Sequence, residues 1–162
     1  MANLKLDFED EMDEPYTLVA IHCSEEEYKL AYLLNLHLGM KLARRTVDLD
    51  FSNKGILVTF PLYDYENSNQ YTNYYLVSNR CRFEEANLNS SEGLFASAVE
   101  KSSTQYLIPE LKKVDYFLKI FSDFETVPLR KIVSEINEIK QVISAYTVEV
   151  DTIKSKNNLI FD

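Results

Sequence analysis

Glycine is scarce in this chain of 162 residues: Gly39, Gly55 and Gly93 are the only three, and they lie far apart. Loops that cradle the phosphate groups of nucleotides need glycines close together, because their backbone amides must approach the phosphates closely. The sequence therefore argues against a nucleotide-binding site of the familiar Gly-rich kinds.

Cysteine and histidine are scarcer still, with two of each. A four-ligand zinc site would have to use nearly all of them or recruit carboxylates. His22 and Cys23 are neighbours in a predicted strand, where consecutive side chains point to opposite faces, so both cannot serve one site directly. The cysteines show no spacing pattern, which favours two free thiols in a reducing cytoplasm. We predict no metal, no cofactor and no catalytic residue.

Long hydrophobic runs are also absent, because none approaches the roughly 18 residues that a membrane-spanning helix needs. The first residues lack the basic start and apolar core of a secretory signal. The formal net charge of -9 opposes the phosphates of nucleic acids and the headgroups of anionic lipids. We therefore expect a cytoplasmic protein that neither enters a membrane nor binds nucleic acid directly.

Acidic residues, in contrast, are concentrated near the start of the chain. Six carboxylates fall within eight residues: Asp7, Glu9, Asp10, Glu11, Asp13 and Glu14. Such a run is either an arm for a basic partner or a solvated chain end. We favour the solvated end and assign residues 1–15 to an acidic N-terminal segment.

Hydrophobic periodicity predicts two strand–helix–strand units around a central meander. The first unit has a strand at 16–23, a helix from a Ser24–Glu27 capping box to a stop at Gly39, and a strand at 46–51. The second has a strand at 114–121, a helix capped by Thr126 with apolar positions from 129 to 143, and a strand at 146–150. Strands at 56–65 and 71–81 form the meander, and 84–104 is predicted as a loop with one short element.

Two details refine this plan. Pro61 cannot donate a backbone hydrogen bond, so the strand from Ile56 should lie at a sheet edge or break there. The second half of the helix at 24–39 is apolar around most of its circumference, and we expect a later segment or another subunit to cover its outer side.

This order of elements predicts an α+β fold: a mainly antiparallel sheet with two helices packed on one face, in a ferredoxin-like arrangement with extra strands. We place a single domain at 16–151 and a C-terminal tail at 152–162.

Residues 108–116 read Ile-Pro-Glu-Leu-Lys-Lys-Val-Asp-Tyr. This string resembles the signature of the IPExxxVDY proteins, a small bacterial family, whose six defining positions are filled by Ile108, Pro109, Glu110, Val114, Asp115 and Tyr116. The resemblance implies a compact bacterial cytoplasmic protein of about this length and supplies no activity, substrate or cofactor.

The same string can be interpreted structurally. Pro109 favours an extended entry into a polar turn, and Val114 and Tyr116 should share the core face of the next strand. Asp115 should then face the other way and accept hydrogen bonds or pair with a cation. We predict a structural corner, with a binding site built from Glu110, Asp115 and Tyr116 as the alternative.

Tyrosine is abundant in the predicted hairpin, which holds five of the eleven: Tyr63, Tyr65, Tyr71, Tyr74 and Tyr75. Because strand residues alternate, one face cannot bury all five, and exposed rings would suit a protein partner. The alternative is a sheet face packed by its own tyrosines. Tyrosines on a sheet can also stack on RNA bases, but the basic residues of this chain are not clustered.

Function is not established by the sequence. The leading hypothesis is a noncatalytic cytoplasmic protein-interaction or adaptor domain that contacts a protein partner, or a second copy in a homodimer, through the tyrosine hairpin and the leucine-rich helix. The alternative is a small-ligand or nucleotide-sensing regulatory domain, which rests on fold analogy. An RNA-associated role has less support, and no nucleophile paired with a base suggests an enzyme.

Overall fold

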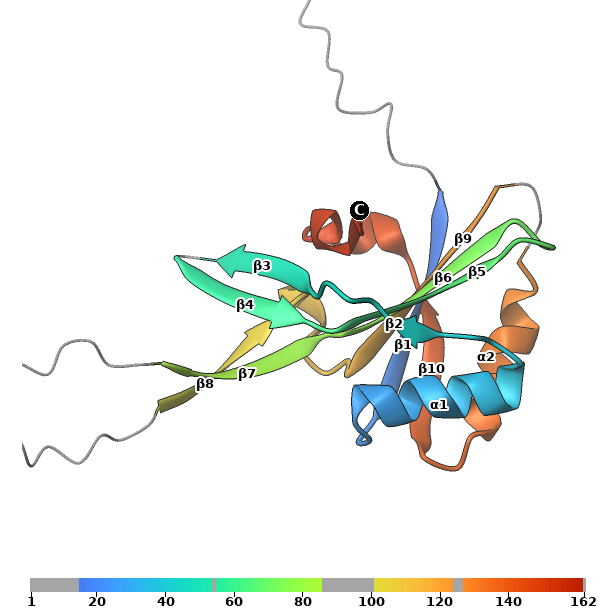
Figure 1. Cartoon of the computed structure of the whole chain (residues 1–162), viewed down its shortest axis with the longest axis horizontal. Coiled ribbons are helices and arrows are strands. Elements are labelled where there is room, and N and C mark those ends of the chain that lie inside the picture. The colour runs from blue at the N-terminus through green and yellow to red at the C-terminus, as the bar shows by residue number, and fades with distance from the viewer. Residues whose placement is uncertain (1–14, 54, 86–100, 124–126, 162) are drawn as a thin grey trace, which may run out of the picture.

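The computed structural model describes residues 15–53, 55–85, 101–123 and 127–161. The acidic segment up to residue 14, Thr126 and most of the predicted 84–104 loop lie outside these ranges. The centre of the fold is a six-stranded antiparallel sheet in the order β10-β1-β9-β6-β5-β2 (Figure 1). Its strands, in chain order, are β1 (Tyr16–Cys23), β2 (Ala43–Arg44), β5 (Leu62–Asn67), β6 (Thr72–Ser78), β9 (Tyr116–Ser122) and β10 (Val142–Val148).

Within the described ranges, the remaining elements are two helices, two small hairpin sheets and three 3₁₀ helices. The helices are α1 (Glu27–Leu38) and α2 (Leu129–Glu138). The small sheets pair β3 (Leu49–Asn53) with β4 (Ile56–Phe60) and β7 (Arg80–Glu85) with β8 (Lys101–Tyr106). The 3₁₀ helices are η2 (Pro109–Leu111), η3 (Val150–Thr152) and η4 (Lys156–Leu159). Among the described residues, no helix is long and apolar enough to cross a membrane.

The predicted α+β fold is confirmed. Strands β10-β1-β9-β6 have the order of a ferredoxin-like sheet, with α1 in the connection from β1 to β6 and α2 in the connection from β9 to β10. Both helices lie on one face, where their apolar residues share one cluster with Val19, Ile21 and Leu118 of the sheet. Strands β5 and β2 extend the sheet at its other edge.

A second hydrophobic core covers the opposite face of the sheet. Leu18, Ala20 and Phe117 point to this side, because side chains alternate along a strand. They pack with Phe60 of β4, with Leu107, Ile108 and Val114, and with Ile153 and Leu159. The segment predicted as a C-terminal tail is therefore packed on the sheet, and the packed structure extends to Phe161.

The two long strands of the predicted meander both break. Pro61 separates β4 from β5, as predicted, and Asn79 separates β6 from β7, which was not predicted. Beyond these breaks β4 and β7 lie side by side and form, with β3 and β8, a wing at the left of Figure 1. Each of the two predicted strands is thus divided in two. The parts β5 and β6 belong to the main sheet, and the parts β4 and β7 belong to the wing.

Several element boundaries differ from the predicted ones. The Ser24–Glu27 capping box is wrong, because α1 has Glu26 at its N-cap and no side-chain cap, whereas the stop at Gly39 is confirmed by its left-handed φ of 68°. Helix α2 ends at Glu138, and Ile143 belongs to β10. The strands predicted at 46–51 and 146–150 are displaced and correspond to β3 and β10.

Candidate functional site

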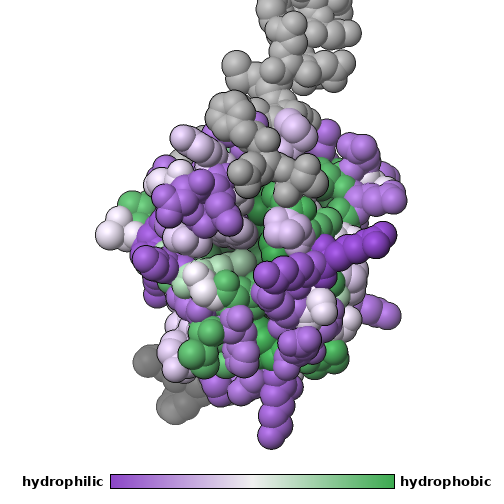
Figure 2. All heavy atoms as spheres, turned by 90° about the vertical axis from the view of Figure 1, so that its right-hand side faces the viewer, coloured by the Kyte–Doolittle hydropathy of each residue, from purple (hydrophilic) through white to green (hydrophobic). Residues whose placement is uncertain are grey.

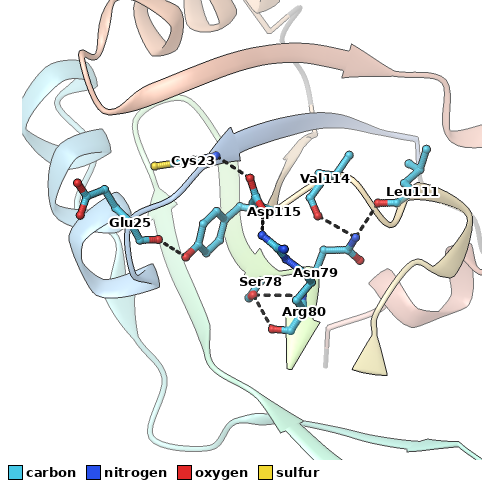
Figure 3. A network of polar contacts seen from close by, with 9 residues as sticks. Cys23, Glu25, Ser78, Asn79, Arg80, Leu111, Val114 and Asp115 are labelled. Carbon is cyan, nitrogen blue, oxygen red and sulfur yellow. Dashed lines mark hydrogen bonds and ion pairs between the residues drawn. The ribbon is translucent and has the colours of Figure 1, made fainter. Parts of the chain in front are cut away.

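The Ile108–Tyr116 segment folds around Asn79, the residue between β6 and β7 (Figure 3). Asn79 is fully buried. Its backbone N–H donates to the carbonyl of Asp115 at 2.9 Å, and its own carbonyl accepts the N–H of Leu107 at 2.9 Å. The backbone on both sides of the segment is therefore fixed to one residue of the β6–β7 junction.

The side chain of Asn79 binds the interior of the same segment. Its amide nitrogen donates to the carbonyls of Leu111 at 2.8 Å and Val114 at 3.0 Å. Its side-chain oxygen accepts the N–H of Ile108 at 2.8 Å. Both amide hydrogens and the oxygen are thus used, as a buried polar side chain requires.

Asp115 connects three parts of the chain. Its carboxylate accepts the backbone N–H of Cys23, at the end of β1, at 2.9 Å. The other carboxylate oxygen forms an ion pair with Arg80 at the start of β7. The prediction that Asp115 accepts hydrogen bonds and pairs with a cation is confirmed.

Val114 and Tyr116 are both buried but lie on opposite faces of the sheet, so the prediction of a shared face is wrong. Val114 precedes β9 in a turn, where strand alternation does not apply. The hydroxyl of Tyr116 donates to the carbonyl of Glu25 in the β1–α1 loop. Burial, followed by the nearby charge of Glu27, raises the pKa of Tyr116 well above its ordinary value, so the ring is neutral at physiological pH.

The first part of the Ile108–Tyr116 segment is hydrogen-bonded to the C-terminal segment. Ile108 is extended and buried, and Pro109 occupies the first turn of η2. One carboxylate oxygen of Glu110 accepts both the N–H and the hydroxyl of Ser155, each at 2.9 Å. Partial desolvation of Glu110 opposes its ionisation, but hydrogen bonds from its own backbone and from Ser155 outweigh this effect and lower its pKa.

A polar hollow of about 400 Å³ lies beside this corner. Its lining includes three acids, Glu25, Glu26 and Glu27, and two arginines, Arg80 and Arg82. Cys23 also borders the hollow, but it is buried and its thiol donates to the carbonyl of Gln141 at 3.4 Å. Burial raises the pKa of this thiol, which keeps it protonated and unreactive at neutral pH. The hollow offers ion pairs and hydrogen bonds rather than a nucleophile.

The five hairpin tyrosines have different environments. Tyr63 and Tyr74 are buried under the helices, and Tyr65 stacks on Tyr74 with ring centroids 5.7 Å apart. Tyr75 is half-buried on the opposite face beside Phe161. Of the five, Tyr71 alone is exposed, so most of these rings pack within the fold.

The end of the molecule that carries the β5–β6 turn and α2 presents a mixed surface. Hydrophobic patches there are interleaved with protruding hydrophilic side chains (Figure 2).

Among the described residues, three exposed large side chains lie together on the outer face of α1. Tyr28, Tyr32 and Leu36 are 64%, 61% and 63% exposed, while Leu30, Leu33 and Leu34 of the same helix are buried. Residues four apart lie on one side of a helix, so the three form a continuous stripe. The sequence predicted that something would cover this side, and no described segment of the chain does so.

Comparisons of the chain with models of protein families, with curated proteins and with solved structures found no match. The resemblance of the Ile108–Tyr116 string to its family therefore stays a prediction. A proposal about function has to rest on the residues themselves. Sequence reasoning missed the role of Asn79, whereas it anticipated the apolar outer side of α1 and named this helix as a contact surface.

Proposed function

We propose that this chain is a noncatalytic protein-interaction domain whose contact surface is the outer face of α1. The observation that carries the proposal is the exposure of Tyr28, Tyr32 and Leu36 in one stripe. A surface helix normally places polar residues on the side away from the core. Three large apolar side chains there indicate a surface that is covered in a complex.

The composition of the helix supports this proposal. From Leu30 to Met40 the chain contains no Asp, Glu, Lys or Arg, although 27% of all residues are charged. Depletion of charge and enrichment of tyrosine are typical of the centre of a protein interface. The stripe therefore resembles the centre of a protein interface in its composition, and it is also exposed.

A small-ligand sensing domain is the second candidate, and the polar hollow beside Asp115 is the observation that favours it. The ion pair between Arg80 and Asp115 already joins two of its charged groups. The hollow thus forms part of the corner that holds the fold together, whereas the stripe on α1 contributes nothing visible to folding. This contrast favours the interaction domain.

Site-specific photocrosslinking in cells tests the proposal. A photoreactive phenylalanine analogue replaces Tyr32, and the same analogue at Ile143 of β10 serves as the control, because Ile143 is also apolar and 72% exposed. We expect a discrete protein adduct from position 32 and none from position 143. No adduct at position 32, or the same pattern at both positions, would contradict the proposal.

A further inference from the structure

We infer that the occupant of the α1 face is a second copy of this chain, bound about a two-fold axis that passes beside Tyr32. This inference rests on the proposed function, because it names the partner of the same surface. It commits to an antiparallel contact between the α1 helices of two identical subunits. Symmetry and charge support it, and the area of the stripe sets its expected strength.

The stripe is self-complementary under a two-fold axis. Tyr28 and Leu36 lie four residues to either side of Tyr32, which is about 6 Å along the helix in each direction. In an antiparallel pair, Tyr32 therefore meets Tyr32 of the partner subunit, and Tyr28 meets Leu36 of the partner subunit. A two-fold interface requires this property, since the same patch must fit itself.

The two ends of α1 carry opposite charge. Glu26 lies just before α1 and Lys41 lies shortly after it, and both are exposed. Neither takes part in the ion pairs recorded within the described part of the chain. An antiparallel arrangement brings the acidic end of one helix to the basic end of the other and also opposes the two helix dipoles favourably. The uncharged middle lets two molecules of net charge -9 approach each other there.

The area of the stripe sets the expected strength of the dimer. From their exposed fractions, the three side chains offer on the order of 350 Å². A standard stable interface buries about 800 Å² on each partner. We therefore expect a weak dimer, with a dissociation constant of roughly 10–100 μM, in equilibrium with monomer.

Disulfide trapping of the purified chain tests the geometry. In a Cys81→Ser background, Tyr32→Cys places a thiol beside the axis, where facing helices bring the two Cα atoms within the range that a disulfide spans, about 4.4–6.8 Å. Mild oxidation should convert most of this variant to a covalent dimer. Tyr28→Cys and Leu36→Cys should each stay largely monomeric, whereas the double variant should crosslink. Ile143→Cys is the control for random collision and should stay monomeric.

Charge reversal provides an independent test by sedimentation equilibrium. Glu26→Lys and Lys41→Glu should each weaken the dimer about tenfold, and the double variant should recover most of the loss. Both side chains are exposed, so each variant should still unfold cooperatively, with a thermal midpoint only slightly below that of the wild type because the new charge opposes the dipole of α1.

Two outcomes would overturn the inference: a chain that stays monomeric up to about 500 μM, or trapping at Ile143→Cys as efficient as at Tyr32→Cys. The photocrosslinking experiment separates the two levels of the proposal. An adduct at position 32 with a different protein would support the interaction domain and reject the homodimer. No adduct at all would reject both.

Discussion

A single asparagine fixes the corner at which the main sheet meets the wing. Asn79 has no exposed surface, and its side chain holds three backbone groups of the segment between Ile108 and Val114. Asparagine suits this position because one side chain supplies two donors and one acceptor. Three residues of the Ile108–Tyr116 string take part in this corner directly: Ile108 and Val114 supply backbone groups that Asn79 binds, and Asp115 pairs with Arg80.

The first prediction concerns Asn79. Asn79→Ala should lower the free energy of unfolding by about 3 kcal/mol, because it leaves the buried N–H of Ile108 and the buried carbonyl of Val114 without their partner and removes one of the two hydrogen bonds to the carbonyl of Leu111. Asn79→Asp should lower the free energy of unfolding by about as much. It keeps the oxygen that accepts the N–H of Ile108, but it places a second oxygen against the carbonyls of Leu111 and Val114. Asn157→Ala, at an exposed position of η4, is the matched control and should change stability by less than about 0.5 kcal/mol. Urea denaturation measures the stability of all three variants. An equal loss of stability in Asn79→Ala and Asn157→Ala would show that the hydrogen bonds of Asn79 do not stabilise the fold.

The corner was only partly predictable from the sequence. The sequence predicted an acceptor role for Asp115, because the alternation of the strand placed it away from the core. Asn79 gave no local signal, since a lone asparagine near the end of a predicted strand is ordinary. Its partners lie about 30 residues later in the chain, and such non-local contacts leave no periodic pattern. Val114 was assigned to the wrong face because the turn before β9 shifts where alternation begins.

At the scale of elements, both helices use an asparagine to hold the chain that follows them. Asn35 of α1 accepts the N–H of Leu42 at 2.8 Å and donates to its carbonyl at 3.0 Å. Asn137 of α2 does the same for Ala145 of β10, at 2.8 and 2.9 Å. Ala145 belongs to the edge strand of the main sheet, so Asn137 occupies backbone groups that another strand could otherwise bind.

The second prediction follows from this edge. Asn137→Ala should lower the free energy of unfolding by about 1–2 kcal/mol through the loss of two backbone contacts, and it should speed aggregation by opening the edge of β10. Ser134→Ala is the control, because Ser134 is exposed on the same helix and shows no bond to β10. Urea denaturation and light scattering at high concentration measure the two effects. Equal aggregation of both variants would show that the edge is protected in some other way.

Sequence patterns predict the boundaries of elements less well than the elements themselves. The apolar spacing of α2 continues through Ile139 to Ile143, yet the helix ends at Glu138 and the chain turns into β10. Neither glycine nor proline marks this turn, and isoleucine fits a strand as well as a helix. The two strand breaks also differ in how well the sequence predicts them. Pro61 lacks a backbone N–H, so its break can be predicted from the residue itself, whereas the break at Asn79 depends on tertiary hydrogen bonds.

At the scale of the whole molecule, the sheet is buried between two cores, and tyrosines take part in both. Tyr63, Tyr74 and Tyr116 belong to the core under the helices, and Tyr75 packs against the other core. Burial raises the pKa of each of these four phenols, most strongly that of Tyr116. The folded state therefore holds these protons more tightly than the unfolded chain does.

This difference gives the last prediction, which concerns stability at alkaline pH. A group whose pKa is raised by folding contributes stability that is complete below its unfolded pKa, about 10 for tyrosine, and is lost as pH rises towards the folded pKa. The free energy of unfolding should therefore begin to fall near pH 10, about the unfolded pKa of tyrosine, and fall more steeply as the pH rises above it. Tyr116→Phe should cost about 1 kcal/mol at neutral pH through the lost bond to Glu25, but it should lose less stability than the wild type between pH 9 and pH 11. Tyr71→Phe, at an exposed position, should follow the wild-type pH profile. Urea denaturation across this range measures the slopes, and a wild-type stability that stays constant to pH 11 would show that the buried phenols ionise without opening the fold.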